Sequence, residues 1–229
     1  MTYKPKFILD GKEVDKITAF LFHAGGHEDP KPLAANAGKS FQGVKVYGQG
    51  FLFDDNDPES TSIAEMNRLI EKDPKNAERI FPYIGGEEVN SHPTYSHHRY
   101  AINFGEMSEE ESLQYPELMK IVEEKVKPYR MKNNREGYKR YWWQHGEKRP
   151  GLFGAIFSLE RVLLRSLTSK HFAFTFLPNG YVYDQSLIVL AISEFSFFTL
   201  VSCRIHEIWA SFFGSTLEDR LRYTPTDCF

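Results

Sequence analysis

The stretch RVLLRSLTSKHFAFTFLPNGYVYDQSLIVL, residues 161–190, contains three short apolar runs rich in β-branched and aromatic residues. Such runs, bounded by polar or turn-forming residues, are typical of β-strands. We therefore predict strands over residues 161–167, 171–177 and 181–190. Asn179-Gly180 lies between the last two runs, and this dipeptide adopts the positive φ angles of a type I′ turn at little cost. The sequence thus predicts a β-hairpin at this turn.

Helical patterns lie on both sides of these strands. Apolar residues recur three and four positions apart over residues 63–70 and 118–126, as on one face of a helix. Each pattern follows a pair with capping-box spacing, Ser62 with Glu65 and Ser108 with Glu111. We expect a short apolar helix over about residues 152–158 and one long helix over residues 194–213, capped by Gly214.

The remaining segments complete a mixed fold. We predict a strand over residues 99–104, RYAINF, from their apolar and aromatic content. The proline and paired glycines of residues 81–86, FPYIGG, predict a turn. We assign the chain to the α+β class, with a mixed or antiparallel sheet, a C-terminal hairpin and several packed helices. We expect one domain over residues 1–229, with a possible division into a strand-and-loop part, 1–106, and a helical and hairpin part, 107–229.

Composition narrows the functional classes. No stretch approaches the roughly 18 apolar residues of a membrane-spanning helix, and the N-terminus lacks the apolar core of a signal peptide. We therefore expect a cytoplasmic protein without a membrane partner. The two cysteines, Cys203 and Cys228, predict neither a disulfide framework nor a cysteine zinc site.

Residues 37–40, AGKS, resemble the end of a phosphate-binding P-loop. That loop requires a glycine five positions before its Gly-Lys pair, and Leu33 stands there. Without that glycine the backbone amides cannot wrap around phosphates, so we do not predict a nucleotide site. Lys39, Ser40 and Gln42 can still contact a DNA phosphate or base edge through ordinary hydrogen bonds.

Metal chemistry has weak support in the sequence. His92, His97 and His98 are close together, but adjacent histidines point to opposite sides of an extended chain. Asp10-Gly11-Lys12 and the acids that follow it have the composition of part of a nuclease site, without a second acid at a suitable distance. No cofactor-binding glycine turn or Asn/Asp-Pro-Pro-aromatic tetrad of a methyltransferase is present. We therefore predict no catalytic residues and no metal or cofactor site in this chain, with a metal-dependent nuclease as an alternative.

A basic segment contrasts with the net charge of −3. Residues 125–149 carry nine basic residues against two acidic ones, interleaved with aromatic residues that include Trp142 and Trp143. Cations can neutralise phosphates while aromatic rings stack on bases. The segment therefore favours nucleic-acid contacts at Lys139 and Arg140, or equally a solvated helix face with one of the tryptophans in the core.

Five stretches together resemble one family, the MmeI-like restriction–modification enzymes, also called type IIL or IIG. They are PLAANAGKSFQG (32–43), FPYIGGEEVN (81–90), HRYAINF (98–104), SKH (169–171) and RLRYTPTD (220–227). Their order and spacing are those of the region that follows the methyltransferase domain in such enzymes. The resemblance extends from about Asp10 to Phe229.

The resemblance implies a DNA target-recognition domain, a fragment of a larger enzyme with an adenine-N6 methyltransferase and an endonuclease. The expected partners are double-stranded DNA and a methyltransferase domain or subunit, and S-adenosylmethionine is expected there and not in this chain. By the resemblance, base or phosphate contacts are expected in the loop at residues 39–42, at residues 98–99, along the strand and turn of residues 165–170, and at residues 220 and 222. The residues are Lys39, Ser40, Gln42, His98, Arg99, Arg165, Ser169, Lys170, Arg220 and Arg222. For Arg165 a solvent-facing strand position is the alternative. A protein-interaction fragment, docking through residues 194–213, is a further hypothesis.

Overall fold

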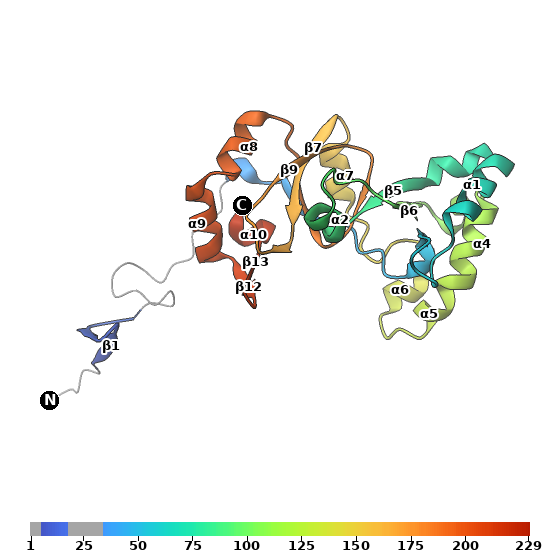
Figure 1. The fold of residues 1–229 in the computed structure, drawn as a ribbon. Coiled ribbons are helices and arrows are strands. Elements are labelled where there is room, and N and C mark those ends of the chain that lie inside the picture. The colour runs from blue at the N-terminus through green and yellow to red at the C-terminus, as the bar shows by residue number, and fades with distance from the viewer. Residues whose placement is uncertain (1–5, 18–33) are drawn as a thin grey trace. The chain divides into compact units, whose positions relative to one another are not determined.

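The computed structural model describes residues 6–17 and 34–229 and divides the chain into two compact units, Met1–Ala34 and Ala35–Phe229. In the first unit, β1 (Phe7–Leu9) and β2 (Lys12–Val14) form an antiparallel hairpin. Its turn is Asp10-Gly11, with both residues at positive φ. The second unit carries the fold that concerns function (Figure 1). These units do not coincide with the possible division at residue 106.

Short helices make up much of the second unit. They are α1 (Ile63–Lys72), α2 (Gly86–Ser91), α3 (Glu109–Ser112), α4 (Pro116–Lys125), α5 (Lys127–Met131), α6 (Glu136–Arg140), α7 (Pro150–Ile156), α8 (Phe195–Val201), α9 (Arg204–Phe213) and α10 (Pro225–Cys228), with the 3-10 turns η1 (Ala34–Asn36), η2 (Gln49–Phe51) and η3 (Pro74–Arg79). In the described part of the chain, no helix is long and apolar enough to cross a membrane.

The strands of this unit form three sheets. They are β3 (Ser40–Gln42), β4 (Leu52–Phe53), β5 (Ile80–Ile84), β6 (Arg99–Ile102), β7 (Arg161–Ser166), β8 (Thr168–Ser169), β9 (Thr175–Pro178), β10 (Val182–Tyr183), β11 (Leu187–Leu190), β12 (Ser215–Leu217) and β13 (Arg220–Arg222). The strand orders are β10-β5-β6-β4, β3-β11-β7-β9 and β12-β13-β8. Only the β10–β5 pair is parallel among these ladders. The expected α+β class is confirmed.

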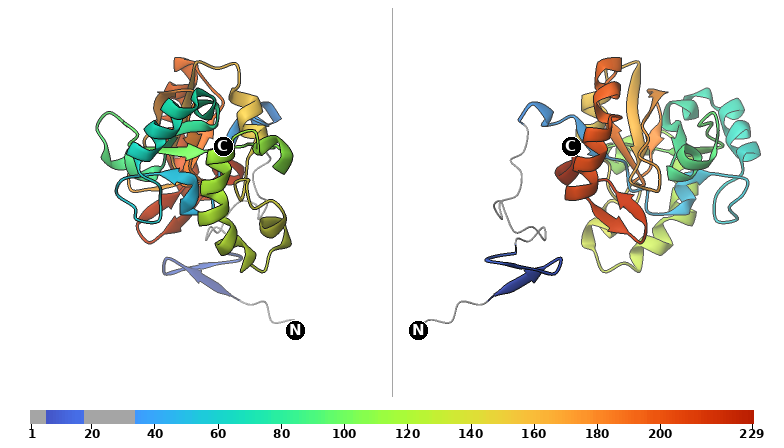
Figure 2. Two further views of the ribbon diagram at one scale, coloured as in Figure 1. Left: turned by 90° about the vertical axis from the view of Figure 1, so that its right-hand side faces the viewer. Right: turned by 60° about the vertical axis from the view of Figure 1, so that its left-hand side comes forward.

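The apolar runs of residues 161–190 are continuous because the sheet β3-β11-β7-β9 is buried on both faces. Val162 and Leu164 of β7 pack in one buried cluster with Leu152 and Ile156 of α7. Leu163, which points to the opposite face, packs in another cluster with residues of α9 and α10. The sheet therefore lies between α7 and the C-terminal helices (Figure 2).

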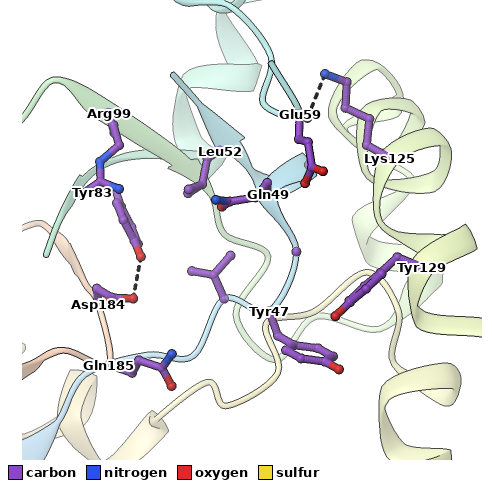
Figure 3. A pocket seen from close by; sticks show the side chains of 13 residues that line it. Tyr47, Gln49, Leu52, Glu59, Tyr83, Arg99, Lys125, Tyr129, Asp184 and Gln185 are labelled. Atoms are coloured by element: carbon purple, nitrogen blue, oxygen red, sulfur yellow. Dashed lines mark hydrogen bonds between the residues drawn. The ribbon is translucent and has the colours of Figure 1, made fainter. Parts of the chain in front are cut away.

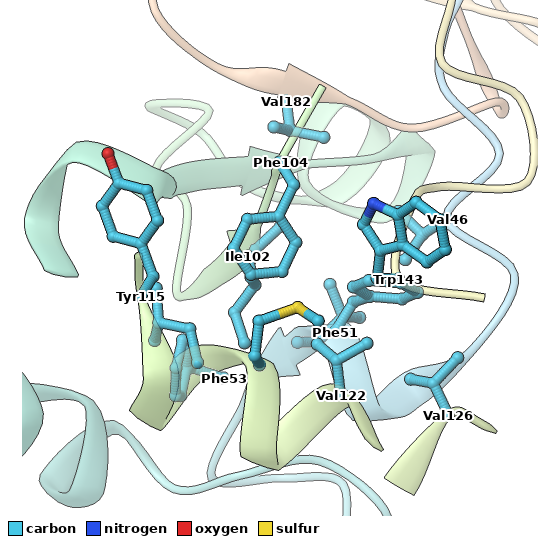
Figure 4. Close-up of a cluster of buried hydrophobic side chains, with 14 of the residues drawn as sticks. Val46, Phe51, Phe53, Ile102, Phe104, Tyr115, Val122, Val126, Trp143 and Val182 are labelled. Atoms are coloured by element: carbon cyan, nitrogen blue, oxygen red, sulfur yellow. The ribbon is translucent and has the colours of Figure 1, made fainter. Parts of the chain in front are cut away.

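A third buried cluster lies under the other four-stranded sheet (Figure 4). Leu118 and Val122 of α4 are fully buried against Phe51 and Phe53. Trp142 and Trp143 are only 5% and 6% exposed and belong to the same cluster. The alternative that placed a tryptophan of the basic segment in the core is therefore confirmed.

The hairpin predicted at Asn179-Gly180 is wrong. β9 pairs with β7, whereas β10, just after the turn, pairs in parallel with β5 of the other sheet. Asn179 is not at positive φ, and its side chain instead bonds the carbonyls of Ile156 and Leu159. The C-terminal hairpin of the structure is β12–β13, and the type I′ pattern occurs at Asp10-Gly11.

Other element boundaries differ from the prediction. The expected helix 194–213 is two helices, because α8 ends at Val201 and Cys203 begins α9 as its N-cap. Gly214 ends α9 as expected, in an extended conformation, where a Cβ would lie 2.4 Å from the Ala210 carbonyl oxygen. The expected turn at 81–86 is the strand β5 followed by α2. The predicted strands 171–177 and 181–190 are shorter, as β9, β10 and β11.

The helix starts follow the sequence closely. Ser62 accepts a hydrogen bond from the Glu65 amide at the start of α1. Ser108 and Glu111 form a reciprocal capping box at the start of α3. Pro116 opens α4, where a missing N–H costs nothing.

Candidate nucleic-acid interface

The third sheet gathers four of the predicted site residues. β13 pairs with β8, so that Leu221 lies opposite Ser169 and Arg222 opposite Thr168. Lys170 directly follows β8, and Arg220 begins β13. β12 adds the outer strand, and we call this three-stranded sheet the ribbon (residues 168–170 and 215–222). It brings together side chains about fifty positions apart in the sequence and extends from the body of the unit in Figure 1.

The charged side chains of the ribbon form only exposed ion pairs. Lys170 lies 2.7 Å from Asp219, with both side chains 63% exposed, and Arg220 lies 2.9 Å from Glu218. Exposed pairs of this kind contribute at most about 1 kcal/mol, so their cations can exchange a carboxylate for a phosphate. Arg222 is exposed, and no ion pair to it is found in the described part of the chain.

The base of the ribbon is rigidly attached. The amide of Tyr223, directly after β13, donates to the Leu167 carbonyl over 2.7 Å. The Tyr223 hydroxyl lies 2.9 Å from Nε2 of His206 on α9, and its ring is fully buried. The ribbon is thereby fixed to β7 and α9, although its outer edge is exposed.

Arg165 of β7 lies against the buried ring of Tyr223, beneath the base of the ribbon. It is 1% exposed, and its guanidinium lies 4.6 to 5.2 Å from the ring centroids of Phe172, Phe174 and Tyr223. Burial lowers the pKa of Arg165 to about 10, so it is protonated at neutral pH. The alternative of a solvent-facing strand residue is wrong. Contact between Arg165 and a base edge stays a prediction, and in this conformation the three rings cover the guanidinium.

The predicted Lys39 loop lies beside the C-terminal segment. Asn36, three residues before Lys39, donates to the Phe229 carbonyl over 2.7 Å. The Lys39 ammonium lies 5.5 Å above the Phe197 ring, and the Ser40 hydroxyl is buried without a hydrogen-bond partner in β3. Gln42 donates to the Gln185 carbonyl. Lys39 and Gln42 therefore contact other parts of the chain, whereas the Ser40 hydroxyl makes no hydrogen bond.

His98 and Arg99 lie elsewhere, at the start of β6, which His98 directly precedes. Arg99 bonds the buried carboxylate of Glu88, which also accepts the Gly85 amide over 2.9 Å, and His98 lies 3.5 Å from the same carboxylate. Burial alone would lower the pKa of Arg99, but the hydrogen bonds to Glu88, the charge of Glu88 and the nearby Tyr83 and Asp54 together outweigh burial and raise that pKa. Arg99 is therefore engaged in an internal ion pair.

Arg99 also lines a polar cavity of about 710 Å³ (Figure 3). Beside it, the Tyr83 hydroxyl donates to Asp184 over 2.6 Å, and burial followed by the Asp184 charge raises the pKa of Tyr83. We did not predict Glu88 or Asp184 as partners. Glu88 stands three residues after Gly85, the spacing of a capping carboxylate, and could have been found; Asp184 follows a strand that the sequence does not delimit.

The basic segment offers fewer exposed charges than its composition indicates. Lys127, Lys139, Lys148 and Arg149 pair with glutamates. Arg130 is fully buried and donates to four backbone carbonyls. Arg140 projects from α6 near the Tyr141 ring, and α6 lies at a different place on the unit from the ribbon (Figure 1). The sheets therefore do not bring Lys139 and Arg140 together with the ribbon residues.

Comparison with known proteins identifies the family. A model of the MmeI target recognition domain matches residues 34–229. The chain belongs to this family.

A solved structure of the type IIL restriction-modification enzyme MmeI in complex with DNA has a similar fold, with a TM-score of 0.67 and 17% sequence identity. The similarity covers 95% of this chain but only 28% of that chain. No curated protein matches the chain. Within residues 6–17 and 34–229 of this family member, no group of three His, Cys, Asp or Glu side chains is placed to hold a metal ion.

Proposed function

We propose that this chain is a sequence-specific DNA-recognition module of a restriction–modification DNA methyltransferase. The observation that carries this proposal is the ribbon, which gathers Ser169, Lys170, Arg220 and Arg222 in a member of a target-recognition family. The MmeI structure of similar fold is a complex with DNA.

The ribbon carries side chains that suit this function. The major groove of B-form DNA, about 12 Å wide, admits a two-stranded β-ribbon, and the β12–β13 hairpin of the ribbon is such an element. Arginine makes paired hydrogen bonds to guanine, and lysine and serine bind phosphate oxygens. We therefore assign Arg220 and Arg222 to base edges, and Lys170 and Ser169 to the DNA backbone.

We assign the chemical step to a methyltransferase domain or subunit outside residues 1–229. That partner would bind S-adenosylmethionine and extrude the target adenine for methylation at N6, which requires a pocket for the flipped base. This chain would position that partner on its DNA site and not catalyse by itself. The proposed location is the cytoplasm.

Selection from randomised duplex DNA, followed by affinity measurements across a salt series, tests the proposal. We expect one enriched sequence, with the logarithm of affinity falling linearly with the logarithm of salt concentration, because each phosphate contact releases a counterion. Binding that is absent at low salt, or that enriches no sequence, would overturn the proposal.

Arg222→Ala separates a base contact from a phosphate contact. We expect a loss of roughly 1–3 kcal/mol with relaxed preference at one base pair. Lys170→Ala should weaken all sequences alike and reduce the salt slope by about 1. Lys120→Ala removes an exposed charge from α4 and serves as the control. An Arg222→Ala variant that binds and discriminates as the parent chain does would remove Arg222 from the interface.

A further inference from the structure

The outward side of α9 is an apolar stripe. Ile205, Ile208 and Trp209 are 80%, 57% and 43% exposed, at positions i, i+3 and i+4 that share one helical face. Ala210, on the inner side, is fully buried in the cluster beneath the sheet. The helix is therefore apolar on the side that packs and on the side that faces solvent.

The helix before α9 in the chain adds further apolar surface. Leu200 of α8 is 62% exposed. In Figure 2, α8 and α9 lie at the same end of the unit. Single exposed apolar side chains are ordinary, but several on one face of a helix mark a surface that another protein covers.

The three residues of the stripe are uncharged, so they offer no cation to a DNA phosphate. Arg204 and Glu207, the charged residues of α9, pair with each other over 2.7 Å. The stripe therefore presents no unpaired cation from α9 to a phosphate, in contrast to the exposed Arg222 of the ribbon. Interfaces between parts that stay together are apolar at their centre and depleted in charge, as this face is.

The similar solved chain is much longer than the fold that it shares with this chain. The fold matched there accounts for 28% of that chain, so most of its length lies outside the region of similarity. We propose that the α9 stripe, formed by Ile205, Ile208 and Trp209, docks against an apolar surface of the methyltransferase part of the same enzyme. This inference rests on the proposed function. The stripe would hold that part on the module while the ribbon remains free to contact DNA.

Thiol labelling at matched positions tests the docking. Ile208→Cys and Leu113→Cys, each in a Cys203→Ser background, place a thiol where the native side chains are both 57% exposed. The labelling rate is compared between this chain alone and the complete enzyme, in which it is joined to, or co-purified with, its methyltransferase part. We expect Cys at position 208 to react at least about tenfold more slowly in the complete enzyme, and Cys at position 113 to keep its rate, because only the first site becomes buried.

Equal rates at position 208 in the two preparations would overturn the proposal. Protection that already occurs in the chain alone, and that grows with protein concentration, would assign the stripe to a second copy and also overturn it. Ile208→Glu gives an independent measurement: it should release the methyltransferase part without changing the affinity of the chain for duplex DNA.

DNA selection with the same preparations distinguishes this proposal from the proposed function. If the enriched sequence is found but position 208 labels freely, only the docking fails. If position 208 is protected but no sequence is enriched, the recognition function fails while the docking stands.

Discussion

Helices α4 and α9 are both ten residues long, yet they use their apolar residues in opposite ways. In α4, Leu118 and Val122 are 0% exposed and pack under a sheet. In α9, Ile205 and Ile208 are 80% and 57% exposed. Helical periodicity in a sequence therefore indicates an apolar face, but not whether this chain supplies the surface that covers it.

The same contrast extends to the buried arginines near these helices. Arg130, just after α4, donates hydrogen bonds to the carbonyls of Val46, Tyr47, Tyr141 and Gln144. Arg165, behind α9, has a buried guanidinium whose two terminal nitrogens have no hydrogen-bond partner. The buried arginine near α4 therefore has hydrogen-bond partners within the chain, whereas the buried arginine near α9 lacks partners for its two terminal nitrogens.

The largest expected effect is a direct test of the two faces. Leu118→Ala should lower the free energy of unfolding by about 4 kcal/mol, because it removes a fully buried side chain and leaves a cavity. Ile208→Ala in the isolated chain should change it by no more than about 0.5 kcal/mol. Urea denaturation of both variants measures the difference. Comparable losses would mean that α9 is already covered in the isolated chain.

The second test compares the two arginines. Arg130→Met should cost about 3 kcal/mol, because carbonyls such as those of Tyr47 and Gln144 lose a buried donor. Arg165→Met should change stability by less than about 1 kcal/mol, since the lost cation–aromatic contacts are offset by the removal of a buried charge. Chemical denaturation of both variants tests this order. If Arg165→Met is as costly as Arg130→Met, the Arg165 guanidinium has partners that the present conformation does not contain.

Local signals in the sequence predicted helix starts at Ser62 and Ser108, since a capping side chain acts within a few residues of itself. Strand pairing was less predictable, because it depends on distant partners. Asn179-Gly180 has a strong local preference for a hairpin, but β5, about a hundred residues earlier, pairs with the strand after it. Tertiary pairing overrides a turn preference in this way when the following strand completes another sheet.

The residues of the candidate site were predicted, but their pairing was not, because it too depends on distant parts of the chain. Family stretches at 169–171 and 220–227 supplied residues that the sheet then brought together, although nothing local to either stretch indicated their pairing. The burial of a charged residue could not be predicted from its residue type. Arg130 lies in a basic segment of the sequence and Arg165 in an apolar strand, and both are buried, Arg165 beneath aromatic rings.

The smallest expected effect concerns two histidines, one in each region. Burial lowers the pKa of His145, in the α4 region, to about 4, and also lowers the pKa of the half-buried His206 on α9. In the unfolded chain His145 takes up a proton near its ordinary pKa of about 6.5, but in the folded chain only near 4. The free energy of unfolding is therefore at its full value above pH 6.5. It should fall as the pH drops toward 4, by about 2 kcal/mol between pH 7 and pH 5 from this group.

Urea denaturation at pH 7 and pH 5 checks this dependence. His145→Gln keeps a side-chain donor for the Ile102 carbonyl, which His145 contacts over 2.8 Å, but cannot be protonated. It should therefore remove most of the loss on acidification, and His206→Gln should remove a smaller part, because His206 is less deeply buried. If both variants lose stability between pH 7 and pH 5 as the parent chain does, neither histidine governs its acid sensitivity. If His206→Gln has the larger effect, the α9 region is the more tightly closed of the two, which would reverse the contrast between α4 and α9.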